Sequence, residues 1–195
     1  MLASITPLGE RGRRSSWAVT TTMHVHGSLA GGAGVGALAG ALGWLALSGV
    51  GIRARVAALG VALAVGLAWE LAGGAVPGPR RQVDERWLDR YRGWVYGLGY
   101  GAQLGAGLVT VVVSSAVYVV PVACFLSADP VTGCAIGAVA GALRGMTVFA
   151  AARVDTPAGL VAFHSRMRII ERPARTAVLL LQLLLAGLAV LEVAV

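Results

Sequence analysis

The sequence has no lysine and little charge of either sign. All sixteen basic residues are Arg, only nine residues are acidic, and charged residues make up 13% of the 195. Hydrophobic residues reach 57%, above the roughly 45–50% apolar share of soluble domains. A water-soluble fold of this size could not bury so much apolar surface. The shortage of charge therefore excludes an ordinary soluble domain and indicates lipid as the solvent.

The sequence also lacks the motifs of common phosphate-binding, catalytic and metal sites. The sequence has no glycine loop followed by Lys for phosphate, no Ser-His-Asp pattern and no zinc-type cysteine spacing. His24 and His26 are two residues apart and would point to nearly opposite faces of a helix, so they cannot share a metal ion. No nucleic-acid-binding motif accompanies the net charge of +7. We therefore expect no metal, no cofactor and no nucleic-acid partner, and an enzyme is not favoured.

Long uncharged stretches predict an all-α transmembrane helix bundle. No charge separates Arg14 from Arg53, and about 20 apolar residues are enough to cross a bilayer. Asp129-Pro130 supplies an N-cap and a first helical residue for the fourth stretch. The third stretch would be about 50 Å long and contains Pro121, so we expect it to be kinked or broken. The sequence predicts one transmembrane domain, residues 1–195, with five spans at about 27–50, 56–76, 94–126, 130–152 and 176–195.

Two polar connections are expected to lie on the membrane surface as short helices. The first covers residues 80–93. The second, residues 153–175, opens with the helix start Asp155-Thr156-Pro157 and then repeats apolar residues at helical spacing. Arg166 and Arg168 fall outside that apolar stripe, which is typical of an interfacial helix.

The Arg residues divide unevenly between the two ends of the predicted spans. One side carries thirteen Arg, and the other carries only Arg53 and Arg55. Because cytoplasmic loops retain positive charge, we expect the N-terminal segment 1–16 in the cytoplasm and the C-terminus outside. No clean cleavage site follows the first basic cluster, so the first helix is expected to remain as an anchor. The absence of Lys and the excess of Ala, Gly and Val suggest a GC-rich bacterial genome, and so the plasma membrane of a bacterium.

Glycine recurs at every fourth residue in three of the predicted spans. This glycine-zipper spacing allows helix backbones to approach closely in lipid. It predicts tight packing, with surfaces that slide during transport as the alternative. The glycines are Gly32, Gly36 and Gly40 in the first span, Gly97, Gly101 and Gly105 in the third, and Gly133, Gly137, Gly141 and Gly145 in the fourth.

Glu70 falls inside the second predicted span, and Arg144 falls inside the fourth. Each lies at helical spacing from glycines and is expected to face the bundle interior. A lone charge at that depth costs at least about 2.5 kcal/mol, so we predict that Glu70 and Arg144 pair in the cytoplasmic half of the bundle. A substrate or proton site fits this pattern. A structural ion pair, or an Arg that reaches cytoplasmic phosphates, fits it too.

The third span adds polar side chains ahead of Pro121. These residues could line a solute path, or they could satisfy backbone carbonyls freed by the proline. Broken helices near the bilayer midplane are how many transporters build their binding sites. The side chains are Gln103, Thr110, Ser114, Ser115 and Tyr118.

The only two cysteines, Cys124 and Cys134, flank a turn that the topology puts outside, where oxidation is permitted. They could be two separate buried thiols, a structural disulfide or a redox pair. A disulfide needs Cα atoms within about 7 Å, whereas neighbouring helix axes lie roughly 8–10 Å apart. A bridge therefore requires that both thiols point into the helix contact.

Residues 97–145 resemble the transmembrane proteins of cytochrome c biogenesis and disulfide reduction. The features that carry the resemblance are the glycines from Gly97, the polar middle, Pro121, the short turn and the glycine-rich return helix with Arg144. That family, related in architecture to small-solute exporters, passes electrons across the membrane through paired cysteines. The resemblance implies a shared fold and a thioredoxin-like partner for Cys124 and Cys134. The family has one Pro-Cys element in each half and usually six spans, whereas here both cysteines lie in neighbouring helices.

These observations favour a small transporter-like protein for a small solute or ion, with a polar site built from Glu70, Arg144 and the third span. Membrane thiol-disulfide electron transfer is one alternative. A non-catalytic membrane subunit or assembly factor is another. The expected partners are the lipid bilayer, a membrane or thioredoxin-like protein, and further copies of the chain.

Overall fold

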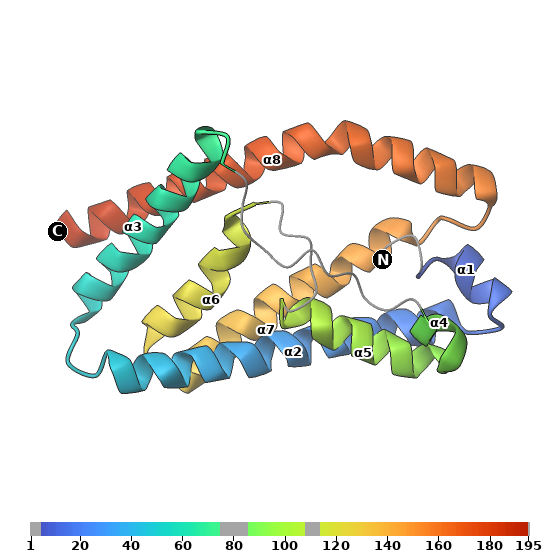
Figure 1. The fold of residues 1–195 in the computed structure, drawn as a ribbon, viewed down its shortest axis with the longest axis horizontal. Coiled ribbons are helices and arrows are strands. Elements are labelled where there is room, and N and C mark those ends of the chain that lie inside the picture. Colours follow the sequence, from blue (N-terminus) through green and yellow to red (C-terminus); the bar gives the residue numbers. More distant parts are fainter. Residues whose placement is uncertain (1–4, 75–85, 108–113, 195) are drawn as a thin grey trace.

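The computed structural model describes residues 5–74, 86–107 and 114–194, and these form helices without a β-strand (Figure 1). Thr6 caps the first helix and Asp129 caps the seventh, each by accepting a hydrogen bond from a backbone N–H of the first turn. The helices are α1 (Pro7–Gly12), α2 (Trp17–Ala46), α3 (Ile52–Leu71), α4 (Arg86–Arg90), α5 (Gly93–Gly105), α6 (Ala116–Ser127), α7 (Pro130–Met146), the 3-10 turn η1 (Thr147–Ala151) and α8 (Pro157–Ala194).

Four of the described helices are long and apolar enough to cross a membrane. They are Trp17–Ala46, Ile52–Leu71, Pro130–Ala151 and Pro157–Val193, and Ala116–Ser127 is a shorter apolar helix. Large apolar side chains such as Leu180, Leu184 and Leu191 are exposed along α8. In water such a surface would be an aggregation hazard, whereas in lipid it is the expected exterior. The helices therefore indicate a membrane protein.

The helix that matches the first predicted span begins at Trp17, well before residue 27. The fourth predicted span, by contrast, has the expected start, because Asp129 accepts from the Thr132 N–H at 2.6 Å and Pro130 is the first residue of α7. The third predicted span, 94–126, corresponds to two shorter helices, α5 and α6. Pro121 lies inside α6, and residues 108–113 are outside the described ranges.

The C-terminal region differs from its prediction. A separate surface helix within 153–175 and a span at 176–195 were expected, whereas α8 runs from Pro157 to Ala194 as one helix. The predicted start is present, since the Thr156 hydroxyl accepts from the Gly159 N–H. Pro173 lies within the helix, and a proline can kink a helix without ending it. Figure 1 shows α8 as a bent helix that passes over α6 and lies along α3.

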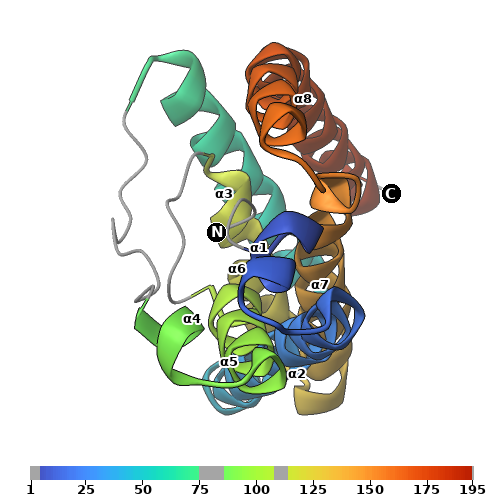
Figure 2. The same cartoon turned by 90° about the vertical axis from the view of Figure 1, so that its right-hand side faces the viewer.

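The helices form two groups joined by α6. Helix α2 packs against both α5 and α7, α3 packs against α8, and α6 contacts α2, α7 and α3 (Figure 2). Contacts between α2 and α7 are made by backbone. A Cβ atom added at Gly36 would lie 2.1 Å from the Gly133 carbonyl oxygen, and one at Gly137 would lie 2.1 Å from that of Gly32. Glycine is therefore required on both sides of this contact.

Candidate intramembrane polar sites

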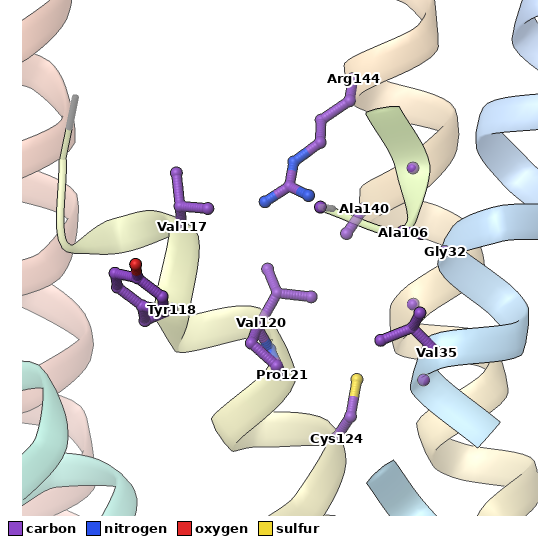
Figure 3. Close-up of a pocket in the computed structure, with 14 residues that line it drawn as sticks. Gly32, Val35, Ala106, Val117, Tyr118, Val120, Pro121, Cys124, Ala140 and Arg144 are labelled. Carbon is purple, nitrogen blue, oxygen red and sulfur yellow. The ribbon is translucent and has the colours of Figure 1, made fainter. Parts of the chain in front are cut away.

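Arg144 lies in α7 and extends toward a cavity between that helix and α6 (Figure 3). It is fourteen residues beyond Pro130, or about 21 Å along the helix at 1.5 Å per residue. The cavity has a volume of about 110 Å³. Its walls include the glycine face of α2 and α7, together with Tyr118, Pro121 and Cys124 of α6. Of the described residues in that wall, Arg144 alone is charged.

Among the described residues, the Arg144 guanidinium has no acidic partner to neutralise it. Within residues 5–74, 86–107 and 114–194, the side chain makes no salt bridge, and the only ion pair found joins Arg13 to Glu10. An unpaired charge inside a membrane is costly and normally faces water or a counter-ion. The cavity beside Arg144 has space for water or for a counter-ion.

Glu70 occupies a second polar site, at the last turn of α3. Its Oε1 atom accepts hydrogen bonds from the Ser114 hydroxyl at 2.8 Å, the Ser115 hydroxyl at 2.6 Å and the Ser115 backbone N–H at 2.5 Å. Ser115 is the N-cap residue of α6 and its own side chain makes no capping bond. The Glu70 carboxylate thus caps α6 from a neighbouring helix, where the exposed N–H groups and the helix dipole favour a negative charge.

Gln182 extends this second site onto α8. Its Nε2 group donates to the Ser115 hydroxyl at 3.0 Å, so the Glu70 site joins α3, α6 and α8. The Glu70 and Gln182 side chains are both buried. Arg175 of α8 contributes an electrostatic attraction to the carboxylate. We call Glu70, Ser114, Ser115 and Gln182 the Glu70 network.

The predicted pairing of Glu70 with Arg144 is wrong. No ion pair joins them in the described part of the chain, and they belong to different helix groups. Helix α3 packs on α8 and α6, whereas α7 presents its glycine face to α2. Serine hydroxyls, a backbone N–H and the field of Arg175 stabilise the Glu70 carboxylate, so it does not need the Arg144 charge.

The remaining candidate residues divide between the two sites. Ser114 and Ser115 belong to the Glu70 network, and Tyr118 lines the Arg144 cavity. Gln103 is half-buried on α5 and is not in the wall of that cavity. Thr110 lies outside the described residues.

Both cysteines are free thiols. Cys124 is buried in the wall of the Arg144 cavity, where its Sγ atom donates to the Gly133 carbonyl oxygen at 3.5 Å. Cys134 is half-buried on α7. This placement corresponds to the first of the three interpretations, in which the two thiols are separate.

Known proteins do not add to this description. Comparisons of the chain with protein-family models, with curated proteins and with solved structures gave no match. The resemblance of residues 97–145 to cytochrome c biogenesis proteins therefore stays a prediction from the sequence. The function has to be argued from the two sites themselves.

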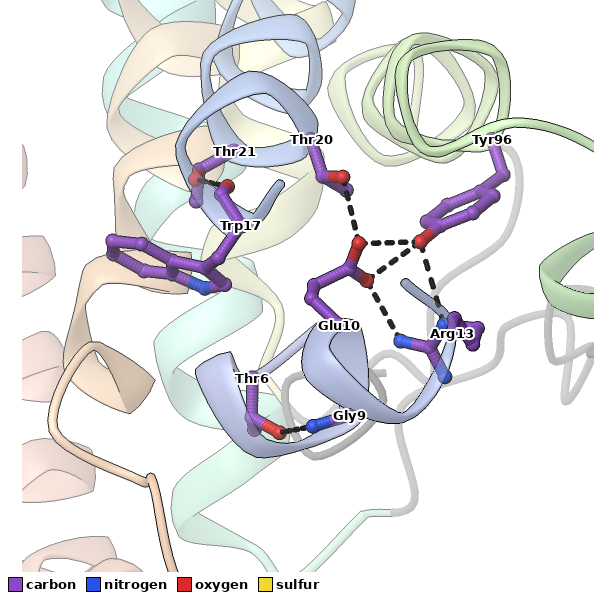
Figure 4. Close-up of polar contacts among 8 residues, drawn as sticks. All are labelled: Thr6, Gly9, Glu10, Arg13, Trp17, Thr20, Thr21 and Tyr96. Carbon is purple, nitrogen blue, oxygen red and sulfur yellow. Dashed lines mark hydrogen bonds and ion pairs between the residues drawn. The ribbon is translucent and has the colours of Figure 1, made fainter. Parts of the chain in front are cut away.

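The sequence predicted residues 1–16 only as a cytoplasmic segment, but Glu10 of this segment belongs to a buried cluster. The Tyr96 hydroxyl donates to Glu10 at 2.6 Å, the Thr20 hydroxyl at 2.8 Å, and the Arg13 Nη2 group at 2.7 Å (Figure 4). Burial alone would raise the pKa of Glu10, but the hydrogen bonds from Tyr96, Arg13 and Thr20 outweigh it and lower that pKa. The cluster fixes α1 to α2 and α5.

A signal for two of the missed residues was present in the sequence. Gln182 is the only polar residue among the leucines of 178–191, and a polar side chain in such a run is expected to face a protein partner. Glu10 is the only acidic residue in the basic N-terminal segment. A single acid beside Arg11, Arg13 and Arg14 suggests an ion pair, but nothing in the segment indicates that it is buried.

Proposed function

We propose that this chain is a small transporter-like membrane protein and that the Arg144 cavity is its site for a small anionic solute. The observation that carries the proposal is a cationic side chain at a cavity inside the helix bundle, without an acidic partner among the described residues. A bound anion would compensate the Arg144 charge. Arg is well suited to this because its guanidinium can donate two parallel hydrogen bonds to a carboxylate or oxyanion.

The dimensions of the cavity limit the size of the solute. At about 30 Å³ per water in the liquid, a volume of about 110 Å³ has room for about three or four water-sized groups. A halide, formate or nitrate ion meets that limit, whereas a nucleotide or a sugar phosphate does not. The thiol of Cys124 adds a polar group to a wall made mostly of glycine and apolar side chains.

Charge at one end of the molecule supports the choice of an anion. The starts of α2 and α5 and the end of α7 lie at the same end in Figure 1. A cavity of about 570 Å³ at that end is lined by Arg13, Arg14 and Arg92, with Tyr91 and Trp94 beside them. Arg13 is paired with Glu10, and Arg14 and Arg92 leave a net positive charge in this cavity. A cationic cavity at this end of the molecule would raise the local concentration of anions.

The topology that we propose has five crossings, in which α5 and α6 together make the third. The Arg-rich end would lie in the cytoplasm of a bacterium and the C-terminus would lie outside. The opposite end carries Arg53 and Arg55 at the start of α3. Glycine faces such as that between α2 and α7 would then be the rigid part of the bundle, or the surfaces that slide.

The redox alternative has one supporting observation, which is that Cys124 lines the same cavity. Thiol-disulfide exchange requires a thiolate that a partner can reach. Replacing both cysteines with Ser separates the two functions, because a solute site would keep its anion affinity and a redox site would lose its activity.

The anion site can be tested by the thermal stability of the purified protein in detergent. Sodium formate should raise the melting temperature of the wild type relative to sodium gluconate at equal ionic strength, because gluconate is too large for the cavity. A ligand at about 100 times its Kd stabilises by about 2.7 kcal/mol. Arg144→Gln should abolish the difference between the two salts. Arg153→Gln, which removes an exposed Arg beyond the same helix, is the matched control and should keep it. An unchanged formate effect in Arg144→Gln would refute the site.

A further inference from the structure

The Glu70 network contains more acceptors than donors. Glu70 Oε1 receives three hydrogen bonds, whereas Glu70 Oε2 is buried and receives none in the described part of the chain. The Oε1 atom of Gln182 is likewise buried without a donor. The two residues are only 4% and 3% exposed, so bulk water does not reach these atoms. Leaving a buried acceptor unsatisfied costs about 1–3 kcal/mol.

We propose that Glu70 is a proton-binding site and that the proton resides on Oε2. Protonation forms one O–H bond on the carboxylate, and the proton comes from the aqueous phase. It converts Oε2 from an acceptor without a donor into a hydroxyl group that can itself donate. Oε1 keeps its three donors in either state.

The charges around Glu70 allow both protonation states. Burial in the bundle favours the neutral acid, while the hydrogen bonds from Ser115 and Ser114 and the charge of Arg175 of α8 favour the carboxylate. From α6, which contains no charged residue, only serine hydroxyls and a backbone N–H face the group. An ionisable side chain can gain and lose a proton when such opposing effects act on its charged form.

Proton binding at Glu70 would affect the wall of the Arg144 cavity, because α6 connects the two sites. Glu70 holds the first residues of this helix, and Tyr118, Pro121 and Cys124 of the same helix line the cavity. Hydrogen bonds to a carboxylate are roughly twice as strong as those to a neutral group, so protonation weakens the attachment of α6 to α3. This coupling rests on the proposed anion site, whereas the proton site itself does not.

The test is infrared difference spectroscopy of the lipid-reconstituted protein between about pH 8 and about pH 3, a range that extends below the ordinary pKa of Glu. We expect a carbonyl band of a protonated carboxyl to appear on acidification of the wild type. Glu70→Gln should lack that band, and Glu192→Gln, which removes an exposed acid of α8, should keep it. Glu70→Gln should fold normally, because its amide supplies an acceptor at one position and a donor at the other.

A second variant tests the position of the proton. Gln182→Leu removes the donor to the Ser115 hydroxyl, which itself donates to Glu70, and should shift the frequency of the Glu70 band. A carboxylate band that is unchanged across the range would overturn the proposal, and so would a band that survives in Glu70→Gln. Stabilisation by Na⁺ without a protonation band would identify a metal cation as the occupant and would also overturn it. Because these spectra do not require the anion, they separate failure of the proton site from failure of the Arg144 site.

Discussion

Replacing Gly36 with Ala is expected to remove most of the folded protein from the membrane. The added Cβ would lie 2.1 Å from the Gly133 carbonyl oxygen and 3.0 Å from the Gly137 Cα atom. Both neighbours are backbone of a helix, so no side chain can rotate out of the way. Helices α2 and α7 would have to separate along the contact. Overpacking against side chains already costs about 1–3 kcal/mol, and a rigid backbone should be at the upper end of that range or beyond it.

Gly34 provides a matched control on the same helix, because a Cβ atom there would have nothing within 4 Å. Gly34→Ala should leave stability unchanged or raise it by up to about 1 kcal/mol through helix propensity. Both variants would be compared by the yield of monodisperse protein and by its melting temperature. Equal yields for Gly36→Ala and Gly34→Ala would mean that α2 and α7 do not touch as described.

Replacing Glu10 with Ala is expected to detach α1 from the rest of the molecule. Glu10 is 1% exposed and receives hydrogen bonds from three side chains, so its loss removes the only acid in a buried cluster. Removing one partner of a fully buried ion pair costs about 3–5 kcal/mol. The cost here should lie below that range, because the partner that remains is 23% exposed and keeps contact with solvent. Here that partner is Arg13. Amide hydrogen exchange within α1 should become fast, while exchange in α2 and α7 should not change.

Arg11→Ala is the control for this variant, since Arg11 is exposed on the same short helix. It should keep the protection of α1. The acid dependence provides a further check. Because the folded pKa of Glu10 is lowered, its stabilisation is fully present above the ordinary value of 4.5 and is lost as the pH falls through the folded value. Protection of α1 that is constant down to strongly acidic pH, or that is the same in Glu10→Ala, would contradict the account.

The sequence predicted a helix end correctly where residues within one helix turn determine it. Asp129-Pro130 identified the start of α7, because an N-cap and a proline act on their own helix turn. The predicted boundary between a surface helix and a last span was placed where the polar segment ends, at residue 175. This boundary is absent from α8, which continues through it as one helix.

Pairing between helices was harder to predict. Hydropathy identified Glu70 and Arg144 as charges within spans, but helical spacing reports only which face a residue occupies. It does not report which helix lies opposite. In the structure, Glu70 accepts a hydrogen bond at the start of α6, and Gln182 of α8 joins the same network. Arg144 lies beside a cavity. Gln182 was missed for the same reason, because its role depends on contact with Ser115, 67 residues earlier in the chain.

The most direct test of the Arg144 site as a transport site is solute flux into sealed liposomes. Wild-type protein and Arg153→Gln should both accelerate the entry of labelled formate over protein-free liposomes. Arg144→Gln should reduce the protein-dependent rate by about tenfold or more, because a charge-assisted hydrogen bond is worth about 1.5–3 kcal/mol and about 1.4 kcal/mol corresponds to a factor of ten. The same protein-dependent rate in Arg144→Gln and in the wild type, or no rate above that of protein-free liposomes for any of the three proteins, would contradict the proposed function.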